Sequence, residues 1–380
     1  MFSLLLAMGL TACGGGNGGG GKWTVTFDTN GGNETYEAQK VADKGLVTDP
    51  GKPTRTDEKG TYKFLGWLDG DAIWSFKNTK VTKDTTLVAR WLDKHSVTYQ
   101  NADGSALGTV SYVDEGDPIE APSVPTAPAG QTFYGWMNTA NGGQIWNYED
   151  GTLNKVMDDV VLKPLFVSSS LQAQQFEAEL CPDFLDEKWG PEGMKGTTYS
   201  GGQGGLGLIG LEELDAEGKN KLGSSGNYTK GTKNYSGYVQ FLYVKGDTLT
   251  WELESSAAAT NVTLFMRISA EYGTQDPKTD EYTNTFDNSE FQVLVNDAEM
   301  PYGRIKMRNI VQTLIPFQDY LVSTTVNLNA GPNVIQMKVN NKIDVTTAIH
   351  AAAPCIDGIK LYSTSEITWP NARLANIDEK

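Results

Sequence analysis

The sequence contains few of the residues that bind transition metals. Only two histidines occur among 380 residues, His95 and His350, and neither has a cysteine or a second histidine at metal-ligand spacing. This excludes a zinc site of the usual Cys/His type, and we interpret both histidines as incidental strand or loop residues. The formal net charge of −16 repels phosphate backbones and anionic lipid headgroups, which argues against nucleic acid as a partner.

Long helix-forming runs are also scarce. The 42 glycines stand among many Thr, Asn, Val and Tyr residues, a composition typical of strands joined by tight turns. No apolar run reaches the roughly 20 residues that a membrane-spanning helix needs. A chain of 380 residues with 39% hydrophobic content has room for two or three folded domains. The composition therefore predicts a mostly β protein of several domains.

The N-terminus resembles the export signal of a bacterial lipoprotein. A short apolar run, residues 2–10, leads into a Leu-Thr-Ala-Cys motif that ends at Cys13, and seven of the next eight residues are glycine. In such signals the apolar segment is removed and the cysteine thiol accepts lipid. We expect a signal peptide at 1–12, a lipidated Cys13 with a Gly-rich tether over 13–22, and a lipid anchor that holds the protein at the cell surface. The alternative is a short buried strand.

One pattern occurs twice in the first half, over 23–92 and 95–167. Val25-Thr26-Phe27 corresponds to Val97-Thr98-Tyr99, and Phe64-Leu65-Gly66-Trp67 corresponds to Phe133-Tyr134-Gly135-Trp136. Each copy opens and closes with an alternating strand, which predicts one small sheet per copy. These phrases resemble the internalin-type B repeat (Listeria-Bacteroides repeat) of bacterial surface proteins, which implies a compact β-grasp-like unit.

The recurring tryptophans of the two copies allow two interpretations. Trp67 and Trp136 could stack on a ligand, but a tryptophan at the same place in each repeat is more typical of a core residue. We therefore predict that both fill the cores of their repeats, and that the glycine before each allows close backbone packing.

Residues 172–365 form the third predicted domain, followed by a tail at 366–380. Glycine, asparagine and aspartate turns separate about eight strands, which predicts a two-sheet β-sandwich. The ordered phrases, from Phe176-Glu177-Ala178-Glu179 to Ile356-Asp357-Gly358-Ile359-Lys360-Leu361, resemble family 6 and family 35 carbohydrate-binding modules, which are jelly-roll (galactose-binding-like) sandwiches. The strongest strand signals lie at 176–180, 238–244, 248–253, 262–268, 291–295, 322–328, 334–339 and 356–361.

The resemblance also implies a structural calcium site. In those modules the first and last strands lie side by side, and their carboxylates bind calcium, which prefers hard oxygen ligands. The corresponding residues here are Glu177, Glu179 and Asp357; alternatively the two glutamates face solvent and bind no metal. If Glu179 lies opposite Asp357, then Cys181 lies opposite Cys355, and a disulfide is plausible in an exported protein. Two buried thiols are the alternative.

A carbohydrate site needs aromatic rings for the apolar faces of sugars and fixed polar groups for the hydroxyls. The loop-rich stretch 183–236 and a later loop supply both kinds of residue, although each could equally be a packing or surface residue. The candidate carbohydrate-binding residues are Trp189, Tyr199, Tyr235, Asn340 and Asn341, with Tyr228 in the same stretch.

No catalytic domain and no positioned acid/base pair is recognisable, so we do not expect an enzyme. The acidic run Glu212, Glu213 and Asp215 is interpreted as an exposed short helix. The resulting hypothesis is a non-catalytic surface lipoprotein whose sandwich binds a polysaccharide or glycan, with the repeats as spacer. The alternatives are a structural or protein-binding adhesin that binds no sugar, and a glycoside hydrolase accessory protein or enzyme.

Overall fold

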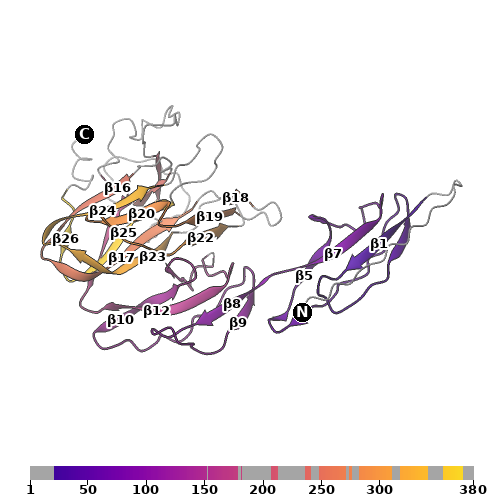
Figure 1. The fold of residues 1–380 in the computed structure, drawn as a ribbon, viewed down its shortest axis with the longest axis horizontal. Coiled ribbons are helices and arrows are strands. Elements are labelled where there is room, and N and C mark those ends of the chain that lie inside the picture. The colour runs from indigo at the N-terminus through magenta and orange to yellow at the C-terminus, as the bar shows by residue number, and fades with distance from the viewer. Residues whose placement is uncertain are drawn as a thin grey trace. The chain divides into compact units, whose positions relative to one another are not determined.

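The chain folds into two compact units, residues 1–93 and 94–380 (Figure 1). Within the part that the computed structural model describes, the regular elements are strands, and none of these residues forms a helix long and apolar enough to cross a membrane. The mostly β prediction is confirmed. The described residues are 21–151, 153–178, 181, 207–212, 236–240, 248–270, 274–275, 282–309, 317–340 and 354–370.

The first unit holds a five-stranded sheet in the order β2-β1-β7-β5-β6. β1 runs parallel to β7, and the other neighbours are antiparallel. A separate two-stranded ribbon, β3 with β4, lies between β2 and β5 in the sequence. The bounds are β1 Lys22–Asp28, β2 Gln39–Ala42, β3 Thr56–Asp57, β4 Gly60–Thr61, β5 Phe64–Asp69, β6 Ala72–Ile73 and β7 Thr85–Trp91.

The second repeat has the same topology as the first. Its order, β9-β8-β12-β10-β11, matches that of the first sheet strand for strand, and β8 again runs parallel to the last long strand, β12. The two predicted copies therefore share one fold. The bounds are β8 Lys94–Tyr99, β9 Ser111–Asp114, β10 Gln131–Asn138, β11 Gln144–Ile145 and β12 Val160–Ser168.

Each repeat has a tryptophan at the centre of its core, as predicted. Trp67 is 2% exposed and makes edge contacts with Phe27, Tyr36 and Phe64. Trp136 is 3% exposed and makes the corresponding contacts with Tyr99 and Phe133. Since these rings are almost fully covered, their main contribution is to the apolar core.

The third region is the predicted β-sandwich. In one sheet β25 lies beside β17 and β17 beside β23; the other has the order β21-β20-β24-β16-β26. Side chains from both pack into one core that includes Trp251. Each of the eight predicted strands overlaps an observed one, with 179–180 and 241–244 of the first two lying outside the described residues. The bounds are β13 Gln172–Glu177, β14 Gly207–Glu212, β15 Ser236–Gln240, β16 Thr248–Ser255, β17 Ala259–Ser269, β18 Thr274–Gln275, β19 Tyr282–Phe286, β20 Phe291–Val295, β21 Ala298–Glu299, β22 Ile305–Asn309, β23 Gln318–Leu328, β24 Gly331–Val339, β25 Cys355–Ser363 and β26 Ile367–Thr368.

Two local sequence interpretations differ from the structure. Glu212 is the last residue of strand β14 and not part of a helix, while Glu213 and Asp215 of the same acidic run lie outside the described residues. The strands β13 and β25 pair antiparallel as expected, but Glu177 lies opposite Gly358, whereas the predicted register places it opposite Ile359. Beyond Glu177, β15 takes over as the neighbour of β25, at Ile356.

The register prediction was one residue out, because it assumed Glu179 opposite Asp357, whereas the observed ladder runs regularly from the pair Gln172–Ser363 to the pair Glu177–Gly358. On its other side, β25 has a bulge between the pairs Arg267–Gly358 and Ile268–Ile356, which leaves Asp357 as the extra residue. Counting along an assumed regular ladder cannot detect such a bulge. Cys181 and Cys355 are both buried. The described ladder ends at Glu177, so the disulfide between them stays a prediction.

The sheet of the second repeat continues into the sandwich. Strand β11 bridges to β23, with Gln144 opposite Tyr320, and the backbone N–H of Leu321 donates to the carbonyl oxygen of Gly143 at 3.0 Å. Repeat 2 and the sandwich therefore belong to one compact unit.

Glycine at position 142 permits a second close approach between repeat 2 and the sandwich region, at Gly303 and Ile305. Its φ is +57°, and an added Cβ would lie 2.8 Å from the carbonyl oxygen of Gly303 and even closer to Ile305. We expect Gly142→Ala to lower the free energy of unfolding by about 1–3 kcal/mol through overpacking, in addition to the cost of its positive φ. Gly108→Ala is the matched control, because Gly108 also has a positive φ (+79°) but open space around it. Equal loss in both variants, measured by denaturant unfolding, would contradict the packing argument.

Candidate functional site

Most of the predicted carbohydrate-binding residues fall outside the described residues. Of that set the structure describes Asn340, which follows β24. Its backbone N–H donates to the carbonyl oxygen of Glu290 at 2.8 Å, and its Nδ2 donates to that of Ser289 at 3.1 Å, so it fixes the turn before β20. The predicted residues that lie outside the described ranges are Cys13, Glu179, Trp189, Tyr199, Tyr228, Tyr235 and Asn341.

The predicted calcium ligands are only partly described. Asp357 is 1% exposed, and its Oδ2 lies 2.6 Å from Nε of Arg267. A guanidinium in contact with this carboxylate opposes a second cation there. Among the described residues, no three His, Cys, Asp or Glu side chains are grouped closely enough to hold a metal ion. Calcium binding by Glu177, Glu179 and Asp357 stays a prediction.

A charged cluster lies on the outer face of the sandwich sheet, where β17, β23 and β25 are neighbours. Asp319 is the centre of this cluster: its Oδ2 lies 2.6 Å from Nζ of Lys360, and its Oδ1 lies 3.5 Å from Nη1 of Arg267. Arg267 also pairs with Asp357. Because the side chain of Asp319 is only 12% exposed, these contacts compensate for the loss of water around a carboxylate.

Repeat 2 covers this cluster with a tyrosine. Tyr134 of β10 stacks on Phe265 of β17, with ring centroids 4.6 Å apart and an interplanar angle of 18°, and its hydroxyl donates to Oδ2 of Asp319 at 2.9 Å. Burial, together with the nearby Asp319 carboxylate, raises the pKa of Tyr134. The hydroxyl therefore remains a hydrogen-bond donor at physiological pH.

A cavity of about 440 Å³ opens beside this contact. Repeat 2 contributes aromatic and aliphatic side chains to its wall, and the sandwich contributes mainly polar ones. A pocket with rings on one side and fixed polar groups on the other can hold an amphipathic small molecule. The lining residues are Ala121, Pro122, Val124, Phe133, Trp136, Ile145, Trp146, Asn147, Tyr148, Glu149 and Leu153 of repeat 2, with Arg267, Phe317, Gln318 and Asp319 of the sandwich.

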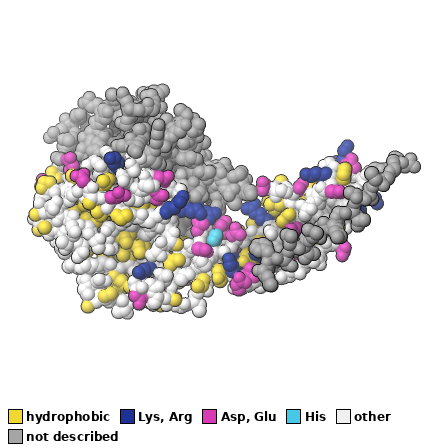
Figure 2. Space-filling model, viewed as in Figure 1, with side chains coloured by type: hydrophobic (Ala, Val, Ile, Leu, Met, Phe, Trp, Pro, Cys, Tyr) yellow, Lys and Arg dark blue, Asp and Glu magenta, His cyan; other side chains and the backbone are white. Residues whose placement is uncertain are grey.

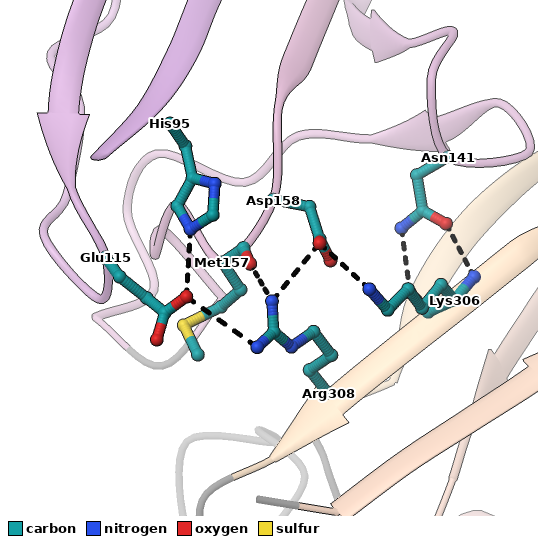
Figure 3. Close-up of polar contacts among 7 residues, drawn as sticks. All are labelled: His95, Glu115, Asn141, Met157, Asp158, Lys306 and Arg308. Carbon is teal, nitrogen blue, oxygen red and sulfur yellow. Dashed lines mark hydrogen bonds and ion pairs between the residues drawn. The ribbon is translucent and has the colours of Figure 1, made fainter. Parts of the chain in front are cut away.

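A second polar cluster joins repeat 2 to strand β22 (Figure 3). Asn141 and Lys306 form a reciprocal pair: Asn141 Nδ2 donates to the Lys306 carbonyl oxygen at 3.0 Å, and the Lys306 N–H donates to Asn141 Oδ1 at 2.6 Å. Asp158 accepts from Nζ of Lys306 at 2.8 Å and pairs with Nη1 of Arg308 at 3.2 Å. Arg308 also donates to the carbonyl oxygen of Met157.

His95 belongs to this cluster and is not the incidental residue that we predicted. Its Nε2 lies 2.9 Å from Glu115, and Glu115 lies 3.7 Å from Nη2 of Arg308. Figure 2 shows a histidine surrounded by acidic and basic side chains on the surface of the molecule. Sequence alone gave no signal for this role, because Glu115 lies 20 residues from His95, and Arg308, which pairs with Glu115, lies 213 residues from it.

The comparisons with known proteins identify the first half of the chain. Residues 23–90 and 95–162 match the model of the Listeria-Bacteroides repeat domain. The chain contains two Listeria-Bacteroides repeats. A putative Gly-rich membrane protein of Evansella cellulosilytica is 31% identical over 137 residues, 35% of this chain and 15% of that protein. Internalin H of Listeria monocytogenes is 30% identical over 136 residues, 34% of this chain and 23% of that protein. The match thus spans less than a quarter of either relative.

The similar solved structures include carbohydrate-binding modules of family 35. One from Clostridium thermocellum is 15% identical and covers 50% of this chain and 97% of its own, with a TM-score of 0.27. Another, from an environmental isolate, is 16% identical and covers 45% and 93%, with a TM-score of 0.26. Similarity at this level transfers no function.

The His95 cluster predicts that stability depends on pH. The hydrogen bond from Glu115 favours the protonated ring and raises the pKa of His95, against the opposing effect of burial. A raised folded-state pKa contributes stability that is complete below the unfolded value of about 6.5 and is lost as pH rises through the folded value. We expect the melting temperature to fall over that window in the native protein.

His95→Gln should remove this part of the pH dependence, as measured by thermal unfolding between pH 5.5 and 8.5. His350→Gln is the matched control, since it removes the other histidine of the chain. If His350→Gln flattens the profile and His95→Gln does not, the titrating group is not His95.

Proposed function

We propose that this chain is a non-catalytic cell-surface protein that binds carbohydrate through its C-terminal β-sandwich. The observation that carries the proposal is the antiparallel pairing of β13 with β25. In the family 6 and family 35 modules that the ordered phrases resemble, the first and last strands are neighbours. The corresponding strands here pair although almost two hundred residues of sequence separate them. A fold does not fix a function, so the proposal needs a direct binding test.

The proposed location is the outer surface of the cell, with lipid on Cys13 as the anchor. The two curated relatives are named as a membrane protein and an internalin, which supports a surface location. In this arrangement repeat 1, a compact unit of its own, acts as spacer. Repeat 2 shares a unit with the sandwich and therefore moves with it.

The charged cluster supports a binding role over a catalytic one. Asp319 contacts Arg267 and Lys360, and Asp357 contacts Arg267. A general acid/base pair must exchange protons with substrate, whereas these two carboxylates are already paired with cations. They are suited to holding side chains in fixed positions.

A protein-binding adhesin is the second candidate. Strand β9 is the edge strand of the repeat 2 sheet, and apolar residues on and before it are exposed: Leu107 by 40%, Val110 by 48% and Tyr112 by 37%. An exposed apolar edge can pair with a strand of another protein. Such a partner would be another surface protein.

The test is a glycan array probed with the full-length chain, in calcium and again in chelator. We expect saturable binding to one polysaccharide class, because aromatic rings and polar groups on a rigid sandwich favour a limited set of sugar shapes. Loss of binding in chelator would support a calcium site at Glu177, Glu179 and Asp357; unchanged binding would argue against it. A folded sample that binds none of the glycans but captures a purified surface protein would replace carbohydrate binding with the adhesin function.

A further inference from the structure

The cavity between repeat 2 and the sandwich has the size of a small-ligand site. Its volume of about 440 Å³ falls in the range of roughly 300–1,000 Å³ that is usual for such pockets. It lies within one compact unit, and both its walls are held by the contacts of Tyr134 with Phe265 and Asp319. The cavity is therefore a built feature of the fold.

The repeat 2 wall offers aromatic rings. Phe133 and Tyr148 line the cavity and are only partly buried, while Trp136 and Trp146, which also line it, are 3% and 6% exposed. Burial raises the pKa of Tyr148, so that its hydroxyl stays protonated. Partly exposed rings of this kind can cover the apolar C–H face of a sugar.

The sandwich wall offers fixed polar groups. Arg267 and Asp319 are register partners on β17 and β23, and Gln318 is held by a hydrogen bond from Nε2 of Gln144 to its Oε1 at 2.5 Å. Oδ1 of Asp319 is buried and, apart from its ion pair with Nη1 of Arg267 at 3.5 Å, makes no hydrogen bond within the described part of the chain. A buried acceptor of this kind is stabilised by a hydroxyl donor.

The charge around the cavity distinguishes between ligand classes. Arg267 and Lys360 supply two positive charges, and Asp319, Asp357 and Glu149 supply three negative ones. The cations are thus already matched by carboxylates. An anionic ligand such as a uronic acid would meet net repulsion, whereas a neutral molecule with many hydroxyls would not.

We propose that the cavity at the junction of repeat 2 and the sandwich binds a neutral saccharide unit. The rings of repeat 2 contact the sugar face, and Arg267, Gln318 and Asp319 contact its hydroxyls. This inference rests on the proposed carbohydrate-binding function and gives it a location and a ligand class. It also makes repeat 2 part of the binding site.

The test compares two full-length variants that differ only in position. Val124 lines the cavity and is 69% exposed, so Val124→Arg adds a long charged side chain at the cavity without disturbing the core. Val110→Arg is the matched control, because Val110 is 48% exposed and does not line the cavity.

The probes are neutral disaccharides of glucose, galactose, mannose and xylose, with glucuronic acid as the anionic comparison. Calorimetry measures the affinity, and the total tryptophan fluorescence, to which Trp136 and Trp146 contribute, gives a second measure of binding.

We expect the native chain to bind at least one neutral disaccharide with a fluorescence change, and Val124→Arg to weaken its affinity tenfold or more while Val110→Arg leaves it unchanged. If the native chain binds sugar and both variants bind equally well, the cavity is not the site, although the proposed function stands. Tighter binding of glucuronic acid than of the neutral sugars would overturn the ligand class. If the folded native chain binds none of the probes and no glycan on the array, both the function and this inference fail.

Discussion

Asp319 imposes the constraint on which the second unit depends. A largely buried carboxylate destabilises a fold by several kcal/mol unless cations or hydrogen-bond donors surround it. Here they come from three strands: Arg267 on β17, Lys360 on β25 and Tyr134 on β10. Two of these strands belong to the sandwich and one to repeat 2. The hydrogen bond from Tyr134 to this carboxylate therefore helps to hold the repeat in place on the sheet.

The two repeats show how one fold can serve as a separate unit or as a docked one. Leu65 of repeat 1 is 38% exposed, and its counterpart Tyr134 stacks on the sandwich. Ile73 at the sheet edge of repeat 1 is 69% exposed, whereas the corresponding Ile145 lines the cavity. Two residues join β5 to β6, but five, 139–143, join β10 to β11. The longer loop contains Asn141 and Gly142, which make the contacts with β22 and Gly303.

The sequence predicted what depends on local period and repetition. The alternating apolar pattern predicted eight strands that each overlap a strand of the sandwich region, and the duplicated Phe-x-Gly-Trp phrase located the two core tryptophans. The bulge at Asp357 was missed. A bulge adds one residue to one strand only, so the apolar pattern of the partner strand does not reveal it. The run of three apolar residues Leu264, Phe265 and Met266, all of them buried, was a signal in the sequence that could have been used. Three apolar residues in a row indicate a strand covered on both faces, and one cover is repeat 2.

The docking of repeat 2 could not be predicted from spacing. Tyr134 and Asp319 are 185 residues apart, and Asn141 and Lys306 are 165 apart, so no window of sequence holds both partners. The consequence for binding is energetic. A ligand held between two separately moving domains would have to restrict that motion and would lose affinity in proportion. In this chain the hydrogen bond between β11 and β23, the Asp319 cluster and the His95 cluster already fix both walls, so that a ligand entering the cavity meets a site formed in advance.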